Sequence, residues 1–326
     1  MKTEPAPHRR AFLLQAAAGA VLVVAPPLRP LLAASASAST KADILSPIRL
    51  WEGEPPGGGT LVGAPQRSVR GALSHIATPL LEVVAPAHPN GSAAVIAGGG
   101  GYRRIGMGTE ACPAAHWLAA RGVTAFVLAY RLPGEGWAAG PRAPLQDAQR
   151  AIRIVRARAP SLGIDPARIL ALGFSAGGHL MGMAATRPDF ASYAARDDID
   201  SLPADVAAAA LLYPVVTLRP PYDGTSTRRM LVGAHPGPES SADWSVETWV
   251  DSRTPPLFVV QAQDDPVADP ANLPILVRAA ERAGVEIEAH RLPSGGHGFG
   301  MGRPGTPSAQ WPSWFDTWLR RQNLLG

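Results

Sequence analysis

Residues 173–180 read Gly-Phe-Ser-Ala-Gly-Gly-His-Leu, and this stretch decides how the chain is interpreted. It follows the apolar run 169–172, which predicts a buried strand, and it leads into residues 180–185, which predict a helix. Glycines at 173 and 177 avoid side-chain clashes across a sharp turn that would hold the hydroxyl of Ser175 clear of the sheet. The start of the helix adds a positive dipole end beside that hydroxyl. The pattern predicts a nucleophilic serine; the alternative is a glycine-rich loop with an incidental serine.

The composition is that of a folded, largely apolar protein. The chain has 326 residues, of which 46% are hydrophobic and 17% charged, so it can bury a substantial core. The single cysteine, Cys112, excludes an internal disulfide framework and a cysteine-based metal site. The formal net charge is +4, but residues 1–38 carry +3 of it. We therefore expect no nucleic-acid partner.

The first forty residues have the pattern of an export signal. Arg9-Arg10 precedes the apolar residues 11–25, a segment short for a membrane span, and Pro26-Pro27 ends it. Small residues at 33–38, several in Ala-x-Ala register, are typical of a signal-peptidase site. We expect a twin-arginine-like leader and linker at 1–40, cleaved near Ala36 or Ala38, and a single domain at 41–326. The mature protein would be periplasmic or secreted, with no stable membrane span. An uncleaved anchor or a disordered tail is the alternative.

A second glycine-rich segment follows the apolar strand expected at 93–97. Residues 98–102 read Gly-Gly-Gly-Gly-Tyr. A phosphate loop would end in Gly-Lys-Ser/Thr, which is missing, and the dinucleotide fingerprints that can be forced at 106–111 and 300–305 do not directly follow a strand. The remaining interpretation is a loop whose backbone N–H groups bind a carbonyl oxygen that becomes negatively charged. The expected donors of this oxyanion hole are Gly100 and Gly101, joined by the N–H of Ala176.

Strands and helices alternate through the rest of the chain. Helices are expected at 114–120, 144–159 and 273–283, and strands at 123–129, 206–212, 257–260 and 286–291. This alternation predicts an α/β fold with a mainly parallel central sheet covered by helices on both faces. Residues 214–255, after the sixth strand, are expected to form a cap or lid. On the helix at 144–159 we expect Asp147 and Arg150 to belong to a mostly solvated face.

Two further residue types complete the predicted catalytic set. Asp264 and Asp265 come just after the strand at 257–260, and His297 lies between glycines on a loop after the last strand. The chain order serine, aspartate, histidine is that of a strand-to-helix nucleophile with its base and orienting acid. We predict His297 as the general base and Asp264 as the acid that orients its ring, with Asp265 as the second choice.

Six motifs stand in order along the chain. They are GGGGY at 98–102, FVLAYRL at 126–132, PLQDAQRAI at 144–152, the serine segment at 173–180, DDPV at 264–267 and GGHGFG at 295–300. Over residues 42–322 the chain resembles bacterial α/β-hydrolases of the acetyl esterase/acetylxylan esterase-like group, which is related to hormone-sensitive-lipase-like carboxylesterases. In that group the position of Gly98 usually holds Pro or His. The resemblance implies cofactor-free hydrolysis of short-chain esters, often acetyl groups on plant polysaccharide.

The residues and the resemblance together predict a serine esterase. Ser175 would attack the ester carbonyl to form an acyl-enzyme, and water activated by His297 would release the acid. We expect no metal and no cofactor, since the sequence shows no ligand cluster for either, and a small-molecule or polysaccharide ester, such as acetylated xylan, as the substrate. One alternative is a serine peptidase of the prolyl-oligopeptidase type, although its usual propeller has no counterpart before residue 93. The other is a non-catalytic binding protein on a hydrolase scaffold.

Overall fold

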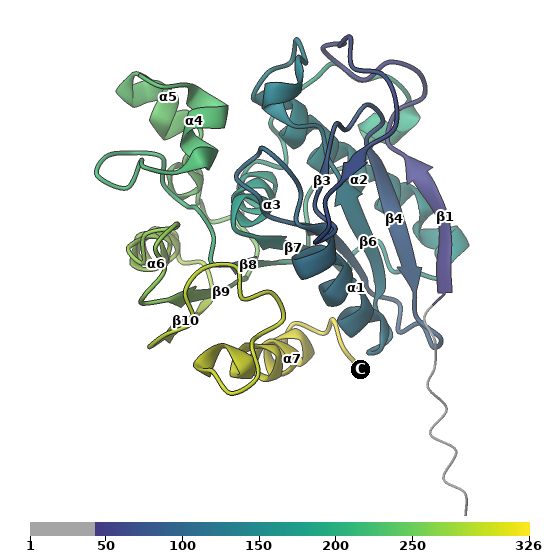
Figure 1. Ribbon diagram of the computed structural model, residues 1–326. Helices are drawn as coiled ribbons and strands as arrows, with labels where there is room; N and C mark the ends of the chain where they lie inside the picture. Colours follow the sequence, from purple (N-terminus) through teal and green to yellow (C-terminus); the bar gives the residue numbers. More distant parts are fainter. Residues whose placement is uncertain (1–42) are drawn as a thin grey trace, which may run out of the picture. The chain divides into compact units, whose positions relative to one another are not determined.

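An eight-stranded sheet is the centre of residues 43–326, the part of the chain that the computed structural model describes (Figure 1). The strands follow one another across the sheet in the order β1 (Asp43–Arg49), β4 (Leu80–Ala85), β6 (Thr124–Ala129), β5 (Ala93–Ala97), β7 (Ile169–Phe174), β8 (Ala208–Leu212), β9 (Leu257–Ala262) and β10 (Ile287–Leu292). From β6 to β10 all neighbours are parallel, and β4 is antiparallel to both of its neighbours, β1 and β6. The predicted α/β fold with a mainly parallel sheet is confirmed.

Helices cover both faces of this sheet. The connections between parallel strands contain α1 (Cys112–Ala119), α2 (Arg142–Leu162), α3 (Ala176–Thr186) and α6 (Asn272–Ala283). Because parallel crossovers are right-handed, and only the step from β5 to β6 runs back across the sheet, α1 lies on the face opposite to α2, α3 and α6. The C-terminal helix α7 (Trp311–Arg321) joins α1, since Phe315 stacks on Trp117 at 5.6 Å between ring centroids.

The strand interiors explain why the sheet is buried. Every residue of β5, β6, β7, β8 and β9 is buried, as continuous apolar runs in a two-sided parallel sheet require. Many of these residues are alanines, which let the helices approach closely. On α7, Trp311, Phe315 and Trp318 lie on one side of the helix, three or four residues apart, and are fully buried against the core, whereas Trp314 is half-buried.

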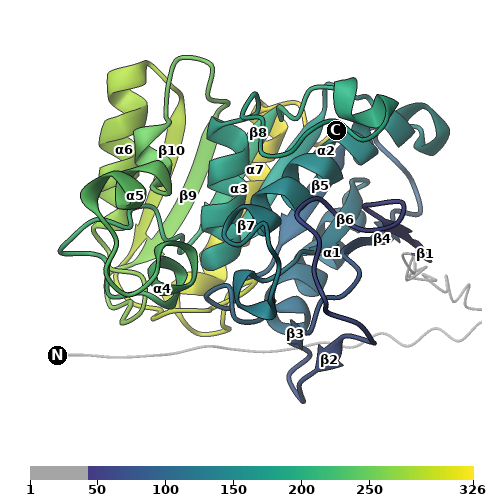
Figure 2. The same ribbon diagram turned by 90° about the horizontal axis from the view of Figure 1, so that it is seen from above.

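The predicted insertion lies between β8 and β9, and β8 is the sixth strand of the main sheet along the chain. It contains α4 (Ser226–Val232), α5 (Pro238–Asp243) and the short helix η4 (Val246–Thr248). A separate ribbon of β2 (Gln66–Arg67) and β3 (Leu73–Ser74) projects away from the sheet, as Figure 2 shows. The remaining short helices are η1 (Met107–Ala111), η2 (Pro133–Glu135), η3 (Asp198–Ser201) and η5 (Pro307–Gln310).

The expectation that Asp147 and Arg150 belong to a solvated face of α2 is wrong. The carboxylate of Asp147 is fully buried and pairs with the guanidinium of Arg131 at 2.9 Å, and neither side chain is exposed. Asp147 also accepts a hydrogen bond from the indole N–H of Trp51 at 2.8 Å. Arg150 is buried too, and it pairs with Asp200 of η3 at 2.9 Å. Both charged side chains can lie in the core because each is paired with an opposite charge, which the burial of a charge requires.

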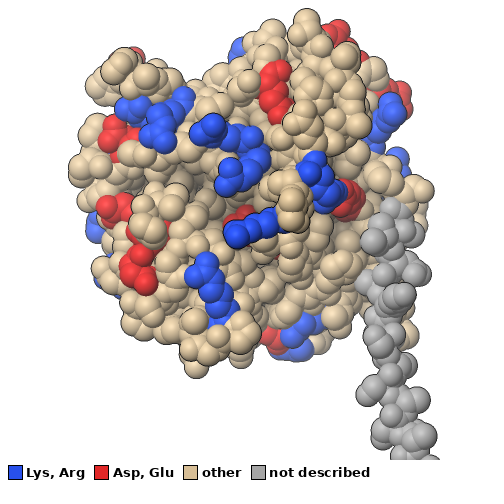
Figure 3. Space-filling model, viewed as in Figure 1, with Lys and Arg blue, Asp and Glu red and all other residues tan. Residues whose placement is uncertain are grey.

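The surface carries charges of both signs. Basic side chains are spread across the middle of the face shown in Figure 3, and acidic side chains lie mainly nearer its edges. No helix within residues 43–326 has the length and apolar character needed to cross a membrane. The leader expected at 1–40 lies outside the described residues.

Candidate active site

Ser175 lies on the sharp turn between β7 and α3 that the sequence predicts. Its backbone has φ 53° and ψ −118°, a strained conformation for a residue with a side chain. A Cβ atom at Gly173 would lie 2.1 Å from the carbonyl oxygen of Gly177, and one at Gly177 would lie 2.2 Å from that of Ala97. Only glycine fits at both positions, so the Gly-x-Ser-x-Gly spacing is a requirement of the turn.

The imidazole of His297 reaches this serine. The distance from Ser175 Oγ to His297 Nε2 is 2.7 Å, although 122 residues separate them in the chain. His297 lies on the loop after β10, and the guanidinium of Arg303 donates hydrogen bonds to the carbonyl oxygens of His297 and Gly298. The ring of Tyr213 packs edge-on against the imidazole, 5.0 Å between centroids. The loop is therefore held from two sides.

The carboxylate beside His297 belongs to Asp265, so the prediction of Asp264 is wrong. Asp265 Oδ2 lies 2.8 Å from His297 Nδ1, and its side chain is completely buried. Its other oxygen accepts the backbone N–H groups of Val267 and Ala268, at 2.8 and 2.9 Å. Asp264 is exposed and accepts a hydrogen bond from the N–H of Gly296. The turn after β9 directs one aspartate outward and the next inward, an orientation that position in the sequence did not reveal.

The loop predicted to hold an oxyanion has most of its polar backbone groups occupied by internal partners. Those partners are Tyr130 Oη for Gly98 O, Glu110 for Gly99 N, Gly106 N for Gly99 O, Arg103 N for Gly100 O and Ser226 Oγ for Gly101 O. Across the described chain, the N–H groups of Gly100 and Gly101 donate no hydrogen bond. Ala176 is the first residue of α3, and the N–H groups in the first turn of a helix have no carbonyl oxygen within the helix to bind. None of the three predicted donors has a hydrogen-bond partner within residues 43–326.

Gly98 occupies the position where the resembled group has Pro or His. A Cβ atom there would lie 2.8 Å from the carbonyl oxygen of Gly106, which is too close for any side chain. Gly100 and Gly101 have φ values of +124° and +64°, in the region that favours glycine. The close approach of the two backbone segments therefore requires this run of glycines.

His179, four residues after the serine, joins the glycine loop to the insertion. Its Nε2 lies 2.6 Å from the carbonyl oxygen of Trp244, which can only accept, so Nε2 carries the hydrogen. Its Nδ1 then accepts a hydrogen bond from the hydroxyl of Tyr102 at 2.9 Å. The imidazole is fully buried, and this burial lowers the pKa of His179 from 6.5 to about 4. His179 is therefore a neutral structural bridge near pH 7.

Two residues at the site had not been singled out from the sequence. Glu110 is buried and accepts hydrogen bonds from Gly99 and from the hydroxyl of Tyr213. Burial raises the pKa of Glu110 above its ordinary value. The available signals were weak: a single glutamate in an apolar helix start, and a tyrosine directly after the apolar run of β8. Nothing in the spacing of either residue indicated that they meet.

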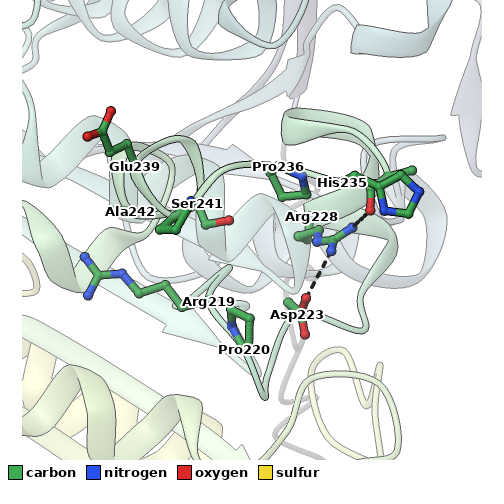
Figure 4. A pocket seen from close by; sticks show the side chains of 11 residues that line it. Arg219, Pro220, Asp223, Arg228, His235, Pro236, Glu239, Ser241 and Ala242 are labelled. Atoms are coloured by element: carbon green, nitrogen blue, oxygen red, sulfur yellow. Dashed lines mark hydrogen bonds and ion pairs between the residues drawn. The ribbon is translucent and has the colours of Figure 1, made fainter.

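The insertion contributes both a contact to the glycine loop and a cavity. Ser226, the first residue of α4, donates its hydroxyl to Gly101 O at 3.0 Å. Beyond it lies a cavity of about 690 Å³ lined by residues of the insertion alone (Figure 4). Arg228 crosses one wall and pairs with Asp223 at 3.0 Å, while Pro220 and Pro236 supply apolar surface. The cavity is a separate feature, because none of the residues around Ser175 lines it.

The fold and the site define an α/β-hydrolase. A parallel sheet presents a strained serine, a histidine and a buried aspartate at the carboxyl ends of its strands, in the chain order of that class. The BD-FAE family profile matches residues 83–278, and the chain belongs to this family.

Known relatives carry names from xylan degradation. The chain is 32% identical over 222 residues to an acetylxylan esterase of Xylanibacter ruminicola, covering 67% of this chain and 43% of that protein. It is 31% identical over 186 residues to endo-1,4-beta-xylanase B of Butyrivibrio fibrisolvens, covering 55% of this chain and 28% of that protein. The chain thus spans less than half the length of either curated relative.

Solved structures match over most of their length. An acetyl ester-xyloside bifunctional hydrolase from Caldicellulosiruptor lactoaceticus aligns with a TM-score of 0.72 and 29% identity, covering 86% of this chain and 97% of that one. Esterase Est2 of Thermogutta terrifontis, with propionate bound, aligns with a TM-score of 0.65 and 25% identity, covering 80% and 96%. These likenesses agree with the α/β-hydrolase fold of the chain and with its place in the BD-FAE family.

Proposed function

We propose that this protein is a serine esterase that hydrolyses short-chain esters, acetyl esters above all, through an acyl-enzyme on Ser175. The observation that carries the proposal is the continuous array from Ser175 Oγ through the ring of His297 to Asp265, with contacts of 2.7 and 2.8 Å. Hydroxyl, imidazole and buried carboxylate in this order form the set that activates a serine for acyl transfer.

In the acylation half, Ser175 Oγ attacks the ester carbonyl carbon while its proton passes to His297 Nε2. The negative charge that develops on the carbonyl oxygen would be met by the N–H groups of Gly100, Gly101 and Ala176, which have no other hydrogen-bond partner among the described residues. The C–O bond of the ester then breaks, and His297 returns the proton to the departing alcohol oxygen. Asp265 keeps Nδ1 protonated, so that Nε2 faces the serine.

Deacylation repeats these steps with water as the nucleophile. His297 Nε2 takes a proton from water as its oxygen attacks the acyl carbon, and the same N–H groups bind the second oxyanion. The bond to Ser175 Oγ breaks, Oγ recovers the proton, and the carboxylic acid leaves. The atoms of the ester and of one water molecule account for both products.

The natural substrate that we propose is an acetylated polysaccharide such as xylan. Support comes from the names of the relatives, which are an acetylxylan esterase and a xylanase, and from a structural neighbour named for acetyl ester and xyloside hydrolysis. The insertion, which contacts the glycine loop through Ser226, would form one wall of the substrate site.

Export is the second part of the proposal. Arg9-Arg10, the apolar residues 11–25 and the small residues at 33–38 support a twin-arginine leader, followed by one catalytic domain at 41–326. A polysaccharide substrate fits a periplasmic or secreted enzyme, since such polymers do not enter cells. N-terminal sequencing of the exported protein is the test, and an intact Met1 would contradict cleavage near Ala36 or Ala38.

A hydrolysis panel tests the activity. The mature protein is assayed on p-nitrophenyl acetate, butyrate and octanoate, on acetylated xylan, and on an aminoacyl-proline anilide. We expect preference for acetate and release of acetic acid from xylan. Activity on the longer chains alone would contradict the acetyl specificity, cleavage of the anilide would favour a peptidase, and no activity on any substrate would contradict the enzyme function.

A further inference from the structure

A buried carboxyl group lies directly beneath the glycine loop. Glu110, on η1, has only 7% of its surface exposed. One carboxyl oxygen, Oε2, accepts the N–H of Gly99 at 2.6 Å, and the other, Oε1, accepts the hydroxyl of Tyr213 at 2.9 Å. Gly99 immediately precedes Gly100, so the carboxyl group fixes the peptide next to an expected oxyanion donor.

The hydrogen bonds continue from Tyr213 to the loop that carries His297. The hydroxyl of Tyr213 accepts the N–H of Gly300 at 3.1 Å, three residues after the histidine. The ring of Tyr213 also packs edge-on against the imidazole. Glu110 and Tyr213 together therefore connect the segment before Gly100 with the segment after His297.

Glycines at 99 and 106 make room for the carboxyl group of Glu110. A Cβ atom at Gly106 would lie 2.6 Å from Glu110 Oε2, and one at Gly99 would lie 3.0 Å from the same oxygen and 2.7 Å from Ser175 Cβ. The glycines let two backbone segments close around the carboxyl group. This close fit places Glu110 within the structure that shapes the oxyanion loop.

The negative charge of a carboxylate does not explain why a glutamate is buried at position 110. Burial raises the pKa of Glu110, which means that the surroundings disfavour its negative form. The hydrogen bonds from Gly99 and Tyr213 oppose this rise most, and the charges of His297 and Arg104 oppose it less. A negative charge so close to the glycine loop would also oppose an oxyanion there. The two hydrogen bonds that the carboxyl oxygens accept are therefore the better account of its role.

We infer that Glu110 is a positioning residue for the oxyanion hole. Its hydrogen bond with the N–H of Gly99 orients the N–H groups that follow, and its hydrogen bond with Tyr213 holds the glycine loop in a fixed position relative to His297. The inference rests on the proposed esterase activity. It assigns Glu110 no contact with the substrate. Its effect should appear in the chemical step and leave substrate binding nearly unchanged.

Three variants test this inference through kcat and KM on p-nitrophenyl acetate and through the melting temperature. Glu110→Ala removes both bonds, Glu110→Gln keeps an acceptor for Gly99, and Tyr213→Phe removes only the hydroxyl. Gln149→Ala is the matched control, because Gln149 is equally buried and hydrogen-bonded but joins α2 to the segment after α3. Wild type and Ser175→Ala are assayed first, so that failure of the esterase proposal itself is recognised separately.

We expect Glu110→Ala to lower kcat about 100-fold with KM changed less than about 3-fold, the size of effect seen when one oxyanion donor is lost. Glu110→Gln should stay within about tenfold of wild type, and Tyr213→Phe should lose about tenfold in kcat, since each keeps one of the bonds. Gln149→Ala should lower the melting temperature without lowering kcat. Two results would overturn the inference: a kcat for Glu110→Ala no lower than for the control, or a loss in Glu110→Gln as large as in Glu110→Ala.

Discussion

The buried imidazole of His179 makes the stability of the fold depend on pH in a way that can be calculated. In the folded protein the pKa of His179 is lowered from 6.5 to about 4 by burial. Between these two values the unfolded chain binds a proton that the folded chain does not, so the free energy of unfolding falls as the pH is lowered. A pKa difference of about 2.5 corresponds to a total loss on the order of 3 kcal/mol, of which about 2 kcal/mol has gone by pH 5.

The variant His179→Gln isolates this effect. Glutamine keeps a donor for the carbonyl of Trp244 and an acceptor for the hydroxyl of Tyr102, but it does not titrate. Urea unfolding is measured at pH 7.5 and at pH 5 for both proteins. Wild type should lose about 2 kcal/mol more than the variant between these pH values. Comparing differences removes the contributions of other groups, including Glu110, whose raised pKa acts in the opposite direction.

The exposed His116 supplies the control for this experiment. Its side chain stays in water in both states, so His116→Gln should follow wild type. If His179→Gln lost the same free energy as wild type between pH 7.5 and 5, the buried neutral bridge between Tyr102 and Trp244 would be refuted.

Two other predictions follow from contacts in the structure. Asp265→Asn should lower kcat for p-nitrophenyl acetate about 10⁴-fold, because the amide can hold His297 in the wrong tautomer. Asp264→Asn should keep kcat within about tenfold of wild type. The reverse order of the two losses would show that Asp264 is the acid that orients the ring of His297. Arg131→Met should lower the free energy of unfolding by about 3–5 kcal/mol, since it leaves the buried carboxylate of Asp147 without its partner. The exposed ion-pair residue Arg253, changed to Met, is the control and should alter urea unfolding little, so equal losses would contradict the importance of burial.

The fold was predictable because its signals are local. Continuous apolar runs of four to seven residues predicted most of the parallel strands. Leu145, Ala148, Ile152 and Val155, spaced three or four residues apart, form the buried face of α2. The glycines at 173 and 177 predicted the turn at Ser175, because only one residue type fits there. The charged residues of α2 escaped prediction, since Asp147 is buried through a partner, Arg131, that lies on a different segment.

The site was predictable only in part, for the same reason. Ser175 and His297 follow from chain order and glycine neighbours, and their side chains do meet. The choice between Asp264 and Asp265 depended on which way a turn directs two adjacent side chains, and sequence position carries no such information. Glu110 and Tyr213 are 103 residues apart, so their contact is a property of the folded chain alone.

The most direct test of the account is the rate of p-nitrophenyl acetate hydrolysis by the mature protein and by Ser175→Ala, with circular dichroism to show that both are folded. We expect hydrolysis by the wild type and a loss of at least about 10³-fold in kcat for the variant, because the nucleophile is gone while the fold remains. A folded Ser175→Ala protein with wild-type activity would contradict the acyl-enzyme mechanism and the site on which it rests.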